Sequence, residues 1–314
     1  MNIRELQSSL EEFIFVGQAF RLGVFDALGE KADTAEGLAA RMKFDRRATI
    51  ALLDALAEMK YLKKTAGRYS VASSARRRLI DRAGRDYEGD FWSFLMYLVN
   101  PWRTLPHVMK HGVPDKTSYA GFSMDDFIRG MDSPWKKSIA PEVVRRCIEL
   151  RPGAKSVADI GGAPGTVARE FARRGLSTLI FDLKESNDVM RKELTRVRNI
   201  RVEDGDATKR FPSGLFDIVF LGNLCHGQSP ADNAEMFRMA RERLADGGMI
   251  AVFDNLKGED RRSATLALHM ITQSPHGNVY TRAEYLGWLK EAGFKRLKVH
   301  KLSDRAWSLV VGFR

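Results

Sequence analysis

The run Ser156-Val-Ala-Asp-Ile-Gly-Gly-Ala-Pro-Gly165 is the most informative part of the chain. Its apolar residues from Val157 onward, with Asp159 near the end, predict a short buried strand, and the glycines that follow predict a tight turn. Residues 166–175 then place apolar side chains at helical spacing. A strand, a glycine turn and a helix are typical of the first unit of a nucleotide-binding α/β fold, because glycine lets the backbone approach a ligand and the helix offers unpaired N–H groups.

The turn does not match the dinucleotide pattern G-x-G-x-x-G. Thr166 stands where the last glycine of that pattern would fall, and Pro164 removes a backbone donor that a pyrophosphate would use. An acid beside the turn also suits a ligand that carries cationic groups. We therefore expect a different nucleotide-containing ligand, with these candidate binding residues: Asp159, Gly161, Gly162 and Gly165.

A second acid follows the next strand. Residues 177–181 form an apolar run that ends at Asp182, about twenty residues beyond the glycines. Doubly wound folds place a carboxylate at this position to accept hydrogen bonds from ribose hydroxyls. Together with the glycine turn, Asp182 predicts ribose binding.

The rest of the C-terminal half predicts a mostly parallel sheet. We expect further strands at 200–203, 215–221 and 249–253, and helices at 231–244 and 282–292. Residues 297–301 and 307–313 have no helix between them, so they are expected to pair as an antiparallel hairpin. An ordinary dinucleotide fold does not end in this way.

The first eighty residues predict helices followed by a small hairpin. Thr34 and Asp45 are expected N-caps of two helices, and residues 61–64 and 68–71 read as the two strands of a wing. A winged helix can bind DNA, but the helix after Asp45 is mostly apolar, and Asp54 and Glu58 would repel phosphates. We expect this domain to form a dimer rather than to bind nucleic acid.

Composition describes an ordinary globular protein. The chain has 314 residues, 44% hydrophobic and 29% charged, with a net charge of +11. Its two cysteines are too few for a disulfide framework or a zinc cluster, and no apolar stretch is long enough to span a membrane. The basic run Arg76–Arg78 is expected to be a solvated surface. We expect a cytoplasmic protein without a membrane partner.

The expected domains are 1–86 (winged helix), 87–150 (a helical connector) and 151–314 (the nucleotide-binding domain). The connector is rich in aromatic residues, and some of these rings are candidates for an apolar substrate cavity. His107 and His111 stand four residues apart, but the pattern offers no third ligand, so no metal site is expected.

The whole chain resembles the class I S-adenosylmethionine-dependent O-methyltransferases that carry an N-terminal winged-helix dimerisation domain. These include plant caffeic-acid-type enzymes and bacterial enzymes of secondary metabolism. The resemblance is carried by GVFDAL, TAEGLAARM, VADIGGAPG, FDL, DGGMIAVFD and AGF, which begin at residues 23, 34, 157, 181, 246 and 292.

The resemblance implies a seven-stranded sheet with an antiparallel last strand, a homodimer formed through the N-terminal domain, and S-adenosylmethionine as cofactor. It implies that Gly161 contacts the methionine part of the cofactor, Asp182 the ribose, and Asp206 with Ala207 the adenine. His226 falls on the catalytic histidine of the family and Asp254 on an acid beside it. The chain departs from the family at several positions. Ala163 lies in the turn, and Gly222 stands where plant enzymes have a lysine that contacts the cofactor. Gly227 and Gln228 follow the histidine, and Val279 stands where relatives have a second acid.

Methyl transfer requires alignment of donor and acceptor and removal of the hydroxyl proton, and an imidazole suits the second task. We therefore expect transfer to a hydroxyl of a small aromatic or apolar metabolite, with His226 as general base. His269 and His276 fall in the region that forms the acceptor pocket of relatives. Alternatives are methylation of carbon or nitrogen, an S-adenosylmethionine enzyme that transfers no methyl group, and a DNA-binding regulator that senses the cofactor.

Overall fold

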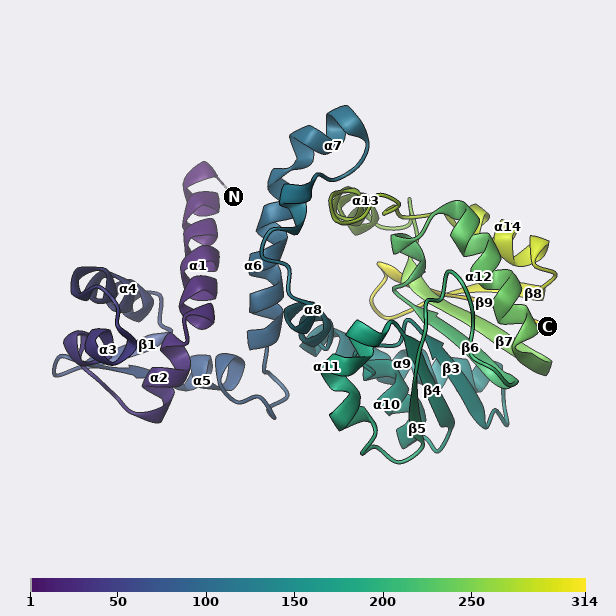
Figure 1. Cartoon of the computed structure of the whole chain (residues 1–314), viewed down its shortest axis with the longest axis horizontal. Coiled ribbons are helices and arrows are strands. Elements are labelled where there is room, and N and C mark those ends of the chain that lie inside the picture. Colours follow the sequence, from purple (N-terminus) through teal and green to yellow (C-terminus); the bar gives the residue numbers. More distant parts are fainter. Residues whose placement is uncertain (1) are drawn as a thin grey trace. The chain divides into compact units, whose positions relative to one another are not determined.

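The structure, a computed structural model, describes residues 2–314 (Figure 1). The chain divides into two compact units, Met1–Leu98 and Val99–Arg314. The expected connector is thus shared between the two units. The division into parts with separate roles at 1–86, 87–150 and 151–314 stays a prediction.

The N-terminal unit consists of helices and one two-stranded hairpin. Its elements are α1 (Ile3–Arg21), α2 (Val24–Glu30), α3 (Ala35–Met42), α4 (Arg46–Glu58), β1 (Leu62–Thr65), β2 (Arg68–Val71), α5 (Ser73–Leu79) and the first part of α6 (Gly89–Arg103). Both expected N-caps are confirmed. The Thr34 hydroxyl accepts the Gly37 N–H at 3.1 Å, and the Asp45 carboxylate accepts the Ala48 N–H at 2.8 Å.

The core of this unit forms where α4 packs against α3, β1 and α1. Leu53 and Leu56 on α4 are fully buried, together with Val16 and Ala19 of α1. The apolar side of α4 is therefore used inside the unit. At its N-terminus, Arg46 is occupied by a hydrogen-bonded ion pair with Glu36 at 2.7 Å.

The C-terminal unit is an α/β domain preceded by short helices. Before the sheet come α7 (Leu105–His111), η1 (Lys116–Tyr119), α8 (Met124–Met131) and α9 (Pro134–Leu150). The sheet region contains β3 (Ser156–Ile160), α10 (Thr166–Arg173), β4 (Ser177–Asp182), α11 (Lys184–Leu194), β5 (Ile200–Asp204), β6 (Phe216–Gly222), η2 (Cys225–Gly227), α12 (Pro230–Glu242), β7 (Leu244–Asn255), α13 (Arg261–Gln273), α14 (Arg282–Glu291), β8 (Lys295–Lys301) and β9 (Trp307–Phe313).

The seven strands form one sheet in the order β5-β4-β3-β6-β7-β9-β8. β3 to β7 pair in parallel, whereas β9 is antiparallel to both β7 and β8. Because β9 lies between them, β8 runs in the same direction as the parallel strands. The predicted fold class, with an antiparallel last strand reached through a hairpin, is confirmed.

Helices cover both faces of this sheet (Figure 1), and alternate strand residues face the two layers. Ile160, Leu221 and Val252 face the layer of α12 and α14. Val157, Phe220 and Phe253 face the layer of α9 and α10. Asp159 stands two residues after Val157 in β3 and therefore faces the same side of the sheet. Its carboxylate lies on the side of α9 and α10.

Several elements differ from the expectations. Helices α5, α11 and α13 were not predicted, and the sequence of α11 is polar overall. β7 begins at Leu244 rather than at 249, because Leu244 pairs with Phe216 before the register shifts to the pair of Ile218 with Met249. None of the helices in the described chain combines the length and the apolar composition that a bilayer crossing requires.

Candidate active site

The predicted cofactor turn lies at the carboxyl end of β3. Gly161 and Gly165 have φ angles of 68° and 87°, a region that strains other residues. A Cβ atom on Gly165 would stand 2.4 Å from a methyl carbon of Leu194. The Gly161 N–H donates to the carbonyl of Phe181 at 2.8 Å, which ties the turn to β4.

Asp182 stands at the end of β4 and faces this turn. Its carboxylate accepts the N–H of Ala163 at 3.0 Å and the N–H of Leu183 at 2.7 Å. The Gly205 N–H donates to the Asp182 carbonyl at 2.9 Å and so connects β4 to the loop after β5. Burial raises the pKa of Asp182 above its ordinary value. The structure thus brings the turn, Asp182 and the loop after β5 to one edge of the sheet.

Asp206 and Ala207 lie in that loop. One oxygen of the Asp206 carboxylate accepts hydrogen bonds from the backbone and hydroxyl of Thr208, at 2.9 and 2.7 Å, and the other pairs with Lys209 at 2.8 Å. Ala207 packs against the core beside α12 and α14. Their contact with adenine stays a prediction.

A small cavity opens beside the turn, on the side of α9 and α10. Its lining residues are Lys136, Asp159, Gly161, Gly162, Thr166, Val167, Phe220 and Gly222. Both ionisable members are buried, with 9% of Lys136 and 2% of Asp159 exposed. Burial raises the pKa of Asp159 to about 7 and lowers the pKa of Lys136. The sequence analysis did not identify Lys136.

His226 and Asp254 meet at the ends of β6 and β7. The Nδ1 atom of His226 lies 2.7 Å from Asp254 Oδ1. The hydroxyl of Tyr285 on α14 donates to Asp254 Oδ2 at 2.9 Å, and the Asn255 N–H donates to Oδ1 at 2.8 Å. Asp254 is fully buried, and Val279, at the position of the second acid in relatives, is a fully buried apolar residue.

This geometry sets the protonation pattern of the site. Burial and the charge of Asp254 raise the pKa of Tyr285 well above its ordinary value, so its hydroxyl remains a donor. With the carboxylate accepting from three groups, Nδ1 of His226 carries the proton and donates it to Asp254. In the neutral imidazole, Nε2 is then the atom that is free to accept a proton.

The loop that carries His226 is held at both ends. Asn233 donates to the carbonyl of Cys225 at 3.0 Å, and the Asn278 N–H donates to the carbonyl of His226 at 2.9 Å. The hydroxyl of Ser274 donates to the carbonyl of Gly227 at 3.3 Å. The segment after α13 is therefore bonded directly to the histidine loop.

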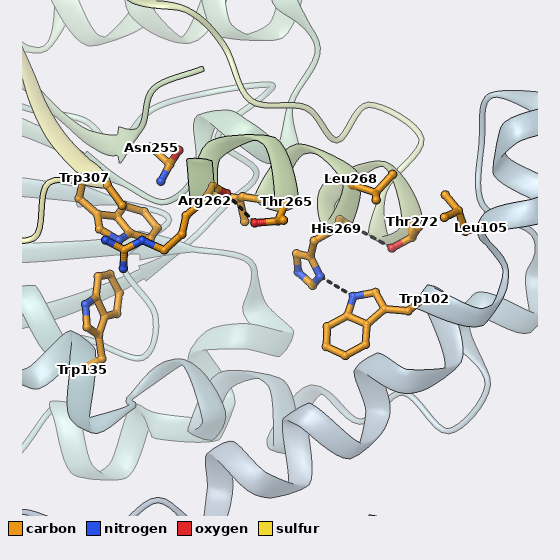
Figure 2. Close-up of a pocket in the computed structure, with 12 residues that line it drawn as sticks. Trp102, Leu105, Trp135, Asn255, Arg262, Thr265, Leu268, His269, Thr272 and Trp307 are labelled. Atoms are coloured by element: carbon orange, nitrogen blue, oxygen red, sulfur yellow. Dashed lines mark hydrogen bonds between the residues drawn. The ribbon is translucent and has the colours of Figure 1, made fainter. Parts of the chain in front are cut away.

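A cavity of about 590 Å³ lies next to Asp254. It is lined by Trp102, Leu105, Trp135, Asn255, Arg262, Thr265, Leu266, Leu268, His269, Thr272, Ala306 and Trp307 (Figure 2). Asn255 follows Asp254 directly in β7 and is 1% exposed, and the side chains of these two strand neighbours point to opposite faces of the sheet. Of the connector aromatics, Trp102 and Trp135 line this cavity, and its role in substrate binding stays a prediction.

The two ends of this cavity differ in chemistry (Figure 2). At one end, the rings of Trp135 and Trp307 pack in a tilted arrangement with centroids 4.8 Å apart, and Arg262 pairs with Asp304 at 2.6 Å. At the other end, the indole N–H of Trp102 donates to Nδ1 of His269 at 2.9 Å. Burial, assisted by the charge of His226, lowers the pKa of His269 to about 4. His269 is therefore neutral at neutral pH with its proton on Nε2, whereas His276 is exposed and outside the cavity lining.

Comparison with known proteins places the chain in a family. A family profile described as a methyltransferase domain matches residues 134–299, more than half of the chain, and this segment includes the turn, Asp182, His226 and Asp254. The chain belongs to this methyltransferase family. The predicted family and S-adenosylmethionine as methyl donor are confirmed.

Individual relatives agree with this assignment. The chain is 27% identical to mouse acetylserotonin O-methyltransferase over 92% of its own length and 82% of the relative. It is 30% identical to the tetracenomycin polyketide 8-O-methyl transferase TcmO of Streptomyces glaucescens, but that match spans only 47% of this chain and 46% of TcmO. The solved structure of PigF with SAH covers all of both chains at 21% identity with a TM-score of 0.82, and so shares the fold.

Sequence reasoning missed several residues of this methyltransferase. Tyr285 contacts Asp254 from 31 positions away, and Lys136 reaches the cavity beside Asp159 from 23 positions away. No local pattern marks such pairs. The rings of His107 and His111 lie tilted to each other with centroids 4.3 Å apart, and an acid that the pattern did not suggest, Asp115, lies 3.8 Å from His107. Within residues 2–314 no group of three potential ligands forms a metal site.

Proposed function

We propose that this methyltransferase transfers a methyl group to a hydroxyl oxygen of a small aromatic metabolite, with His226 as the general base. The observation that carries the proposal is the hydrogen-bonded series Tyr285–Asp254–His226 at the ends of β6 and β7. Asp254 orients the imidazole and stabilises the charge that forms when Nε2 accepts the hydroxyl proton. A positioned base of this kind contributes about 10²–10⁴-fold to a rate.

The cofactor residues have a separate task. S-adenosylmethionine supplies a methyl group on a positively charged sulfur, which is already an activated electrophile. Gly161 in the glycine turn would contact the methionine part, Asp182 would hold the ribose, and Asp206 with Ala207 would face adenine. The close backbone at Gly165 and the carboxylate of Asp182 fit these roles. The protein then contributes alignment of the two reactants and removal of a proton.

The cavity supports an aromatic acceptor. Tryptophan rings offer flat apolar surfaces, and leucine side chains add further apolar contact. A few polar atoms are placed to orient a ligand. The Nε2–H of neutral His269 is a donor. The side-chain oxygen of Asn255 is buried and has no partner in the described part of the chain. We infer an acceptor that presents a hydroxyl near Asn255 and an oxygen that can accept from His269.

The names of the relatives favour oxygen over nitrogen as the methylated atom. TcmO and mouse acetylserotonin O-methyltransferase are both named for O-methylation. The test is incubation with cofactor carrying an isotopically labelled methyl group and with metabolite extracts from the host, followed by mass spectrometry and NMR of the labelled product. A labelled methoxy group supports the proposal, whereas a label on nitrogen or carbon supports the alternatives.

We further propose that the enzyme is a homodimer whose interface is formed by the N-terminal unit and that it does not act by binding DNA. Ile3, Leu6 and Leu10 share one face of α1 and are 75%, 46% and 56% exposed. Arg46, at the start of the helix that would read DNA, is already paired with Glu36. This arrangement favours association through apolar surface over contacts with phosphates.

A further inference from the structure

Trp102 and His269 form a hydrogen-bonded pair in the wall of the cavity of about 590 Å³ (Figure 2). The indole N–H of Trp102, near the end of α6, donates to Nδ1 of His269 on α13 at 2.9 Å. The two ring planes meet at 68° with centroids 6.0 Å apart, so the indole points its edge at the imidazole. The imidazole is thus held through one nitrogen and keeps the other for a ligand.

The indole fixes which nitrogen of His269 carries the proton. An indole N–H donates and never accepts, so Nδ1 must offer its lone pair and the proton of the neutral ring lies on Nε2. Protonation of Nδ1 would set two N–H groups against each other. Burial, assisted by the charge of His226, also lowers the pKa of His269 to about 4 and keeps the ring neutral. His269 therefore presents a fixed donor and does not act as a base at neutral pH.

Within residues 2–314, the Nε2–H group of His269 has no hydrogen-bond partner, and the nitrogen is not sealed inside the core. The other polar side chains that α13 contributes to the cavity are engaged. The hydroxyls of Thr265 and Thr272 donate to carbonyls of their own helix at 3.0 and 2.7 Å, and Arg262 pairs with Asp304 at 2.6 Å. The Nε2–H of His269 is thus the donor that this helix offers to a bound acceptor.

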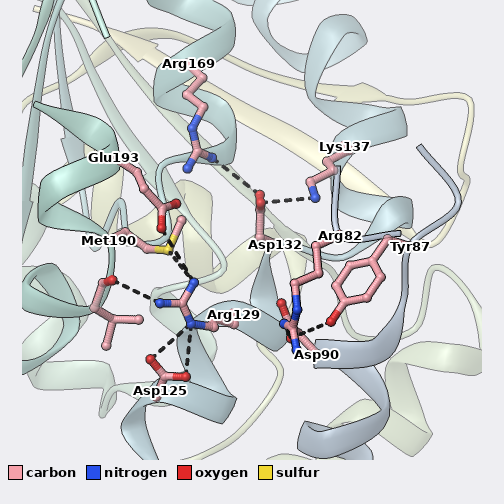
Figure 3. Close-up of polar contacts among 11 residues, drawn as sticks. Arg82, Tyr87, Asp90, Asp125, Arg129, Asp132, Lys137, Arg169, Met190 and Glu193 are labelled. Carbon is pink, nitrogen blue, oxygen red and sulfur yellow. Dashed lines mark hydrogen bonds and ion pairs between the residues drawn. The ribbon is translucent and has the colours of Figure 1, made fainter. Parts of the chain in front are cut away.

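A polar cluster just before α9 shows the contrast. Asp132 accepts the Thr166 hydroxyl at 2.6 Å and pairs with Lys137 at 3.1 Å and with Arg169 at 3.5 Å (Figure 3). Protein side chains take up the charge of this carboxylate, so the cluster does not require a ligand. A polar group in a cavity wall without a protein partner, such as the His269 donor, is instead placed to bind one.

The His269 donor lies near the proposed base. The charge of His226 acts on His269, so the two imidazoles lie within electrostatic range of each other. The segment after α13 is also bonded to the loop of His226, because the Ser274 hydroxyl donates to the Gly227 carbonyl at 3.3 Å. An acceptor bound in this cavity is therefore expected to meet the His269 donor with a second oxygen, apart from the hydroxyl that is methylated.

We propose that Trp102 and His269 together select acceptors that carry a carbonyl oxygen as well as the hydroxyl, such as hydroxyaryl ketones, esters or quinones. A carbonyl oxygen accepts and never donates, so it complements a donor that cannot change. An acceptor with an N–H at this position would place two donors against each other and leave both unpaired, which disfavours its binding. This selection rests on the proposed function of the cavity as the acceptor site.

Three matched probes test the selection. 3-Hydroxyacetophenone, 3-ethylphenol and 3-(methylamino)phenol carry C=O, CH₂ and N–H at the same ring position, and their 2- and 4-isomers vary the distance to the hydroxyl. Ligand-observed NMR measures their dissociation constants in the presence of S-adenosylhomocysteine. We expect the wild type to favour the ketone over the other two probes in at least one isomer. His269→Leu should lower this preference about 2–10-fold, the range for one neutral hydrogen bond, and His269→Gln, whose amide still donates, should keep part of it.

Trp102→Phe separates the effect of the fixed proton from simple packing. Without the indole donor, Nδ1 can carry the proton and Nε2 can accept, so the preference for the ketone over the amine should shrink about 2–10-fold. Trp92→Phe is the matched control, because it removes an indole N–H that donates to Glu88 at 3.0 Å, outside the cavity lining. Thermal unfolding establishes that each variant is folded.

A folded His269→Leu variant with an unchanged preference for the ketone, or equal effects of Trp102→Phe and Trp92→Phe, would overturn the proposal. A wild type that binds the phenols without preferring the ketone would also overturn it, while the acceptor role of the cavity would stand. A wild type that binds none of the probes would overturn both. Methyl transfer to a hydroxyl is tested separately, by the labelled methoxy group.

Discussion

At the residue scale, the site combines positions that are local in sequence with positions that are not. The turn and Asp182 follow their own strands, and each strand brings its last residues to the same edge of a parallel sheet. The Ala163 N–H and the Asp182 carboxylate, 19 positions apart, therefore meet at 3.0 Å. These residues were predictable from the sequence because strand ends fix them.

Asp182→Ala tests the cofactor role. Removing a carboxylate that accepts two ribose hydroxyls should weaken S-adenosylmethionine binding by about 1–3 kcal/mol, because buried polar groups lose their partner. Isothermal titration calorimetry on the folded variant measures this difference. An unchanged affinity would rule out ribose binding by Asp182.

Of the two side chains that contact Asp254, only one was predicted from the sequence. The pairing of His226 with Asp254 was expected from their places after adjacent strands and is found at 2.7 Å. Tyr285 was not expected, because it comes from a helix whose packing on the sheet decides the contact. Asp254 thus obtains a second side-chain donor besides His226.

Asp254→Asn and Tyr285→Phe should give graded losses of turnover. The asparagine variant loses the charge that stabilises the protonated imidazole, so its rate should fall more. The phenylalanine variant loses one hydrogen bond, worth about 1 kcal/mol or about fivefold. Rates at saturating cofactor give the order, and a Tyr285 variant slower than the Asp254 variant would contradict this arrangement.

At the element scale, α13 forms one wall of the cavity of about 590 Å³. Its residue His269 is held by Trp102 from the end of α6, and the segment after it is bonded to the His226 loop. The helix was not predicted, although its histidine was a candidate substrate contact. A cavity wall depends on which segments pack together, and periodicity within α13 carries no information about that packing.

The neutral His269 predicts a pH dependence of stability. The unfolded imidazole takes up a proton near pH 6.5, whereas the folded one stays neutral down to about pH 4. Between these values the unfolded state binds more protons, so its population rises and the free energy of unfolding falls as pH falls. His269→Gln should show a shallower fall from pH 6.5 to 4 in denaturant titrations. A parallel pH profile would show that His269 does not contribute.

At the scale of the whole molecule, the order of strands and helices could largely be predicted from the sequence. Hydrophobic runs and turn residues located all seven strands, and the missing helix between 301 and 307 required the hairpin that β8 and β9 form. The exposed apolar surface was harder to locate. The helix after Asp45 is mostly apolar in sequence, but Leu53 and Leu56 are buried there, and α1 carries the exposed side chains of Ile3, Leu6 and Leu10.

This surface predicts the assembly. Light scattering at micromolar concentration should find a dimer, and Leu10→Lys should raise its dissociation constant about 10–100-fold, since burying a leucine is worth about 1.5–3 kcal/mol. Leu215→Lys is the matched control, because Leu215 is 60% exposed and lies outside the N-terminal unit. A monomeric wild type, or equal effects of the two variants, would contradict the proposed interface.

The measurement that bears most directly on the proposed mechanism is single-turnover methyl transfer by His226→Ala with labelled cofactor and the identified acceptor. Cofactor affinity should be nearly unchanged, because His226 is not among the residues that we expect to hold the cofactor. The transfer rate should fall by about 10²–10⁴, the contribution of a positioned base. A variant that transfers the methyl group at nearly the wild-type rate would show that alignment alone drives the reaction and that His226 is not the base.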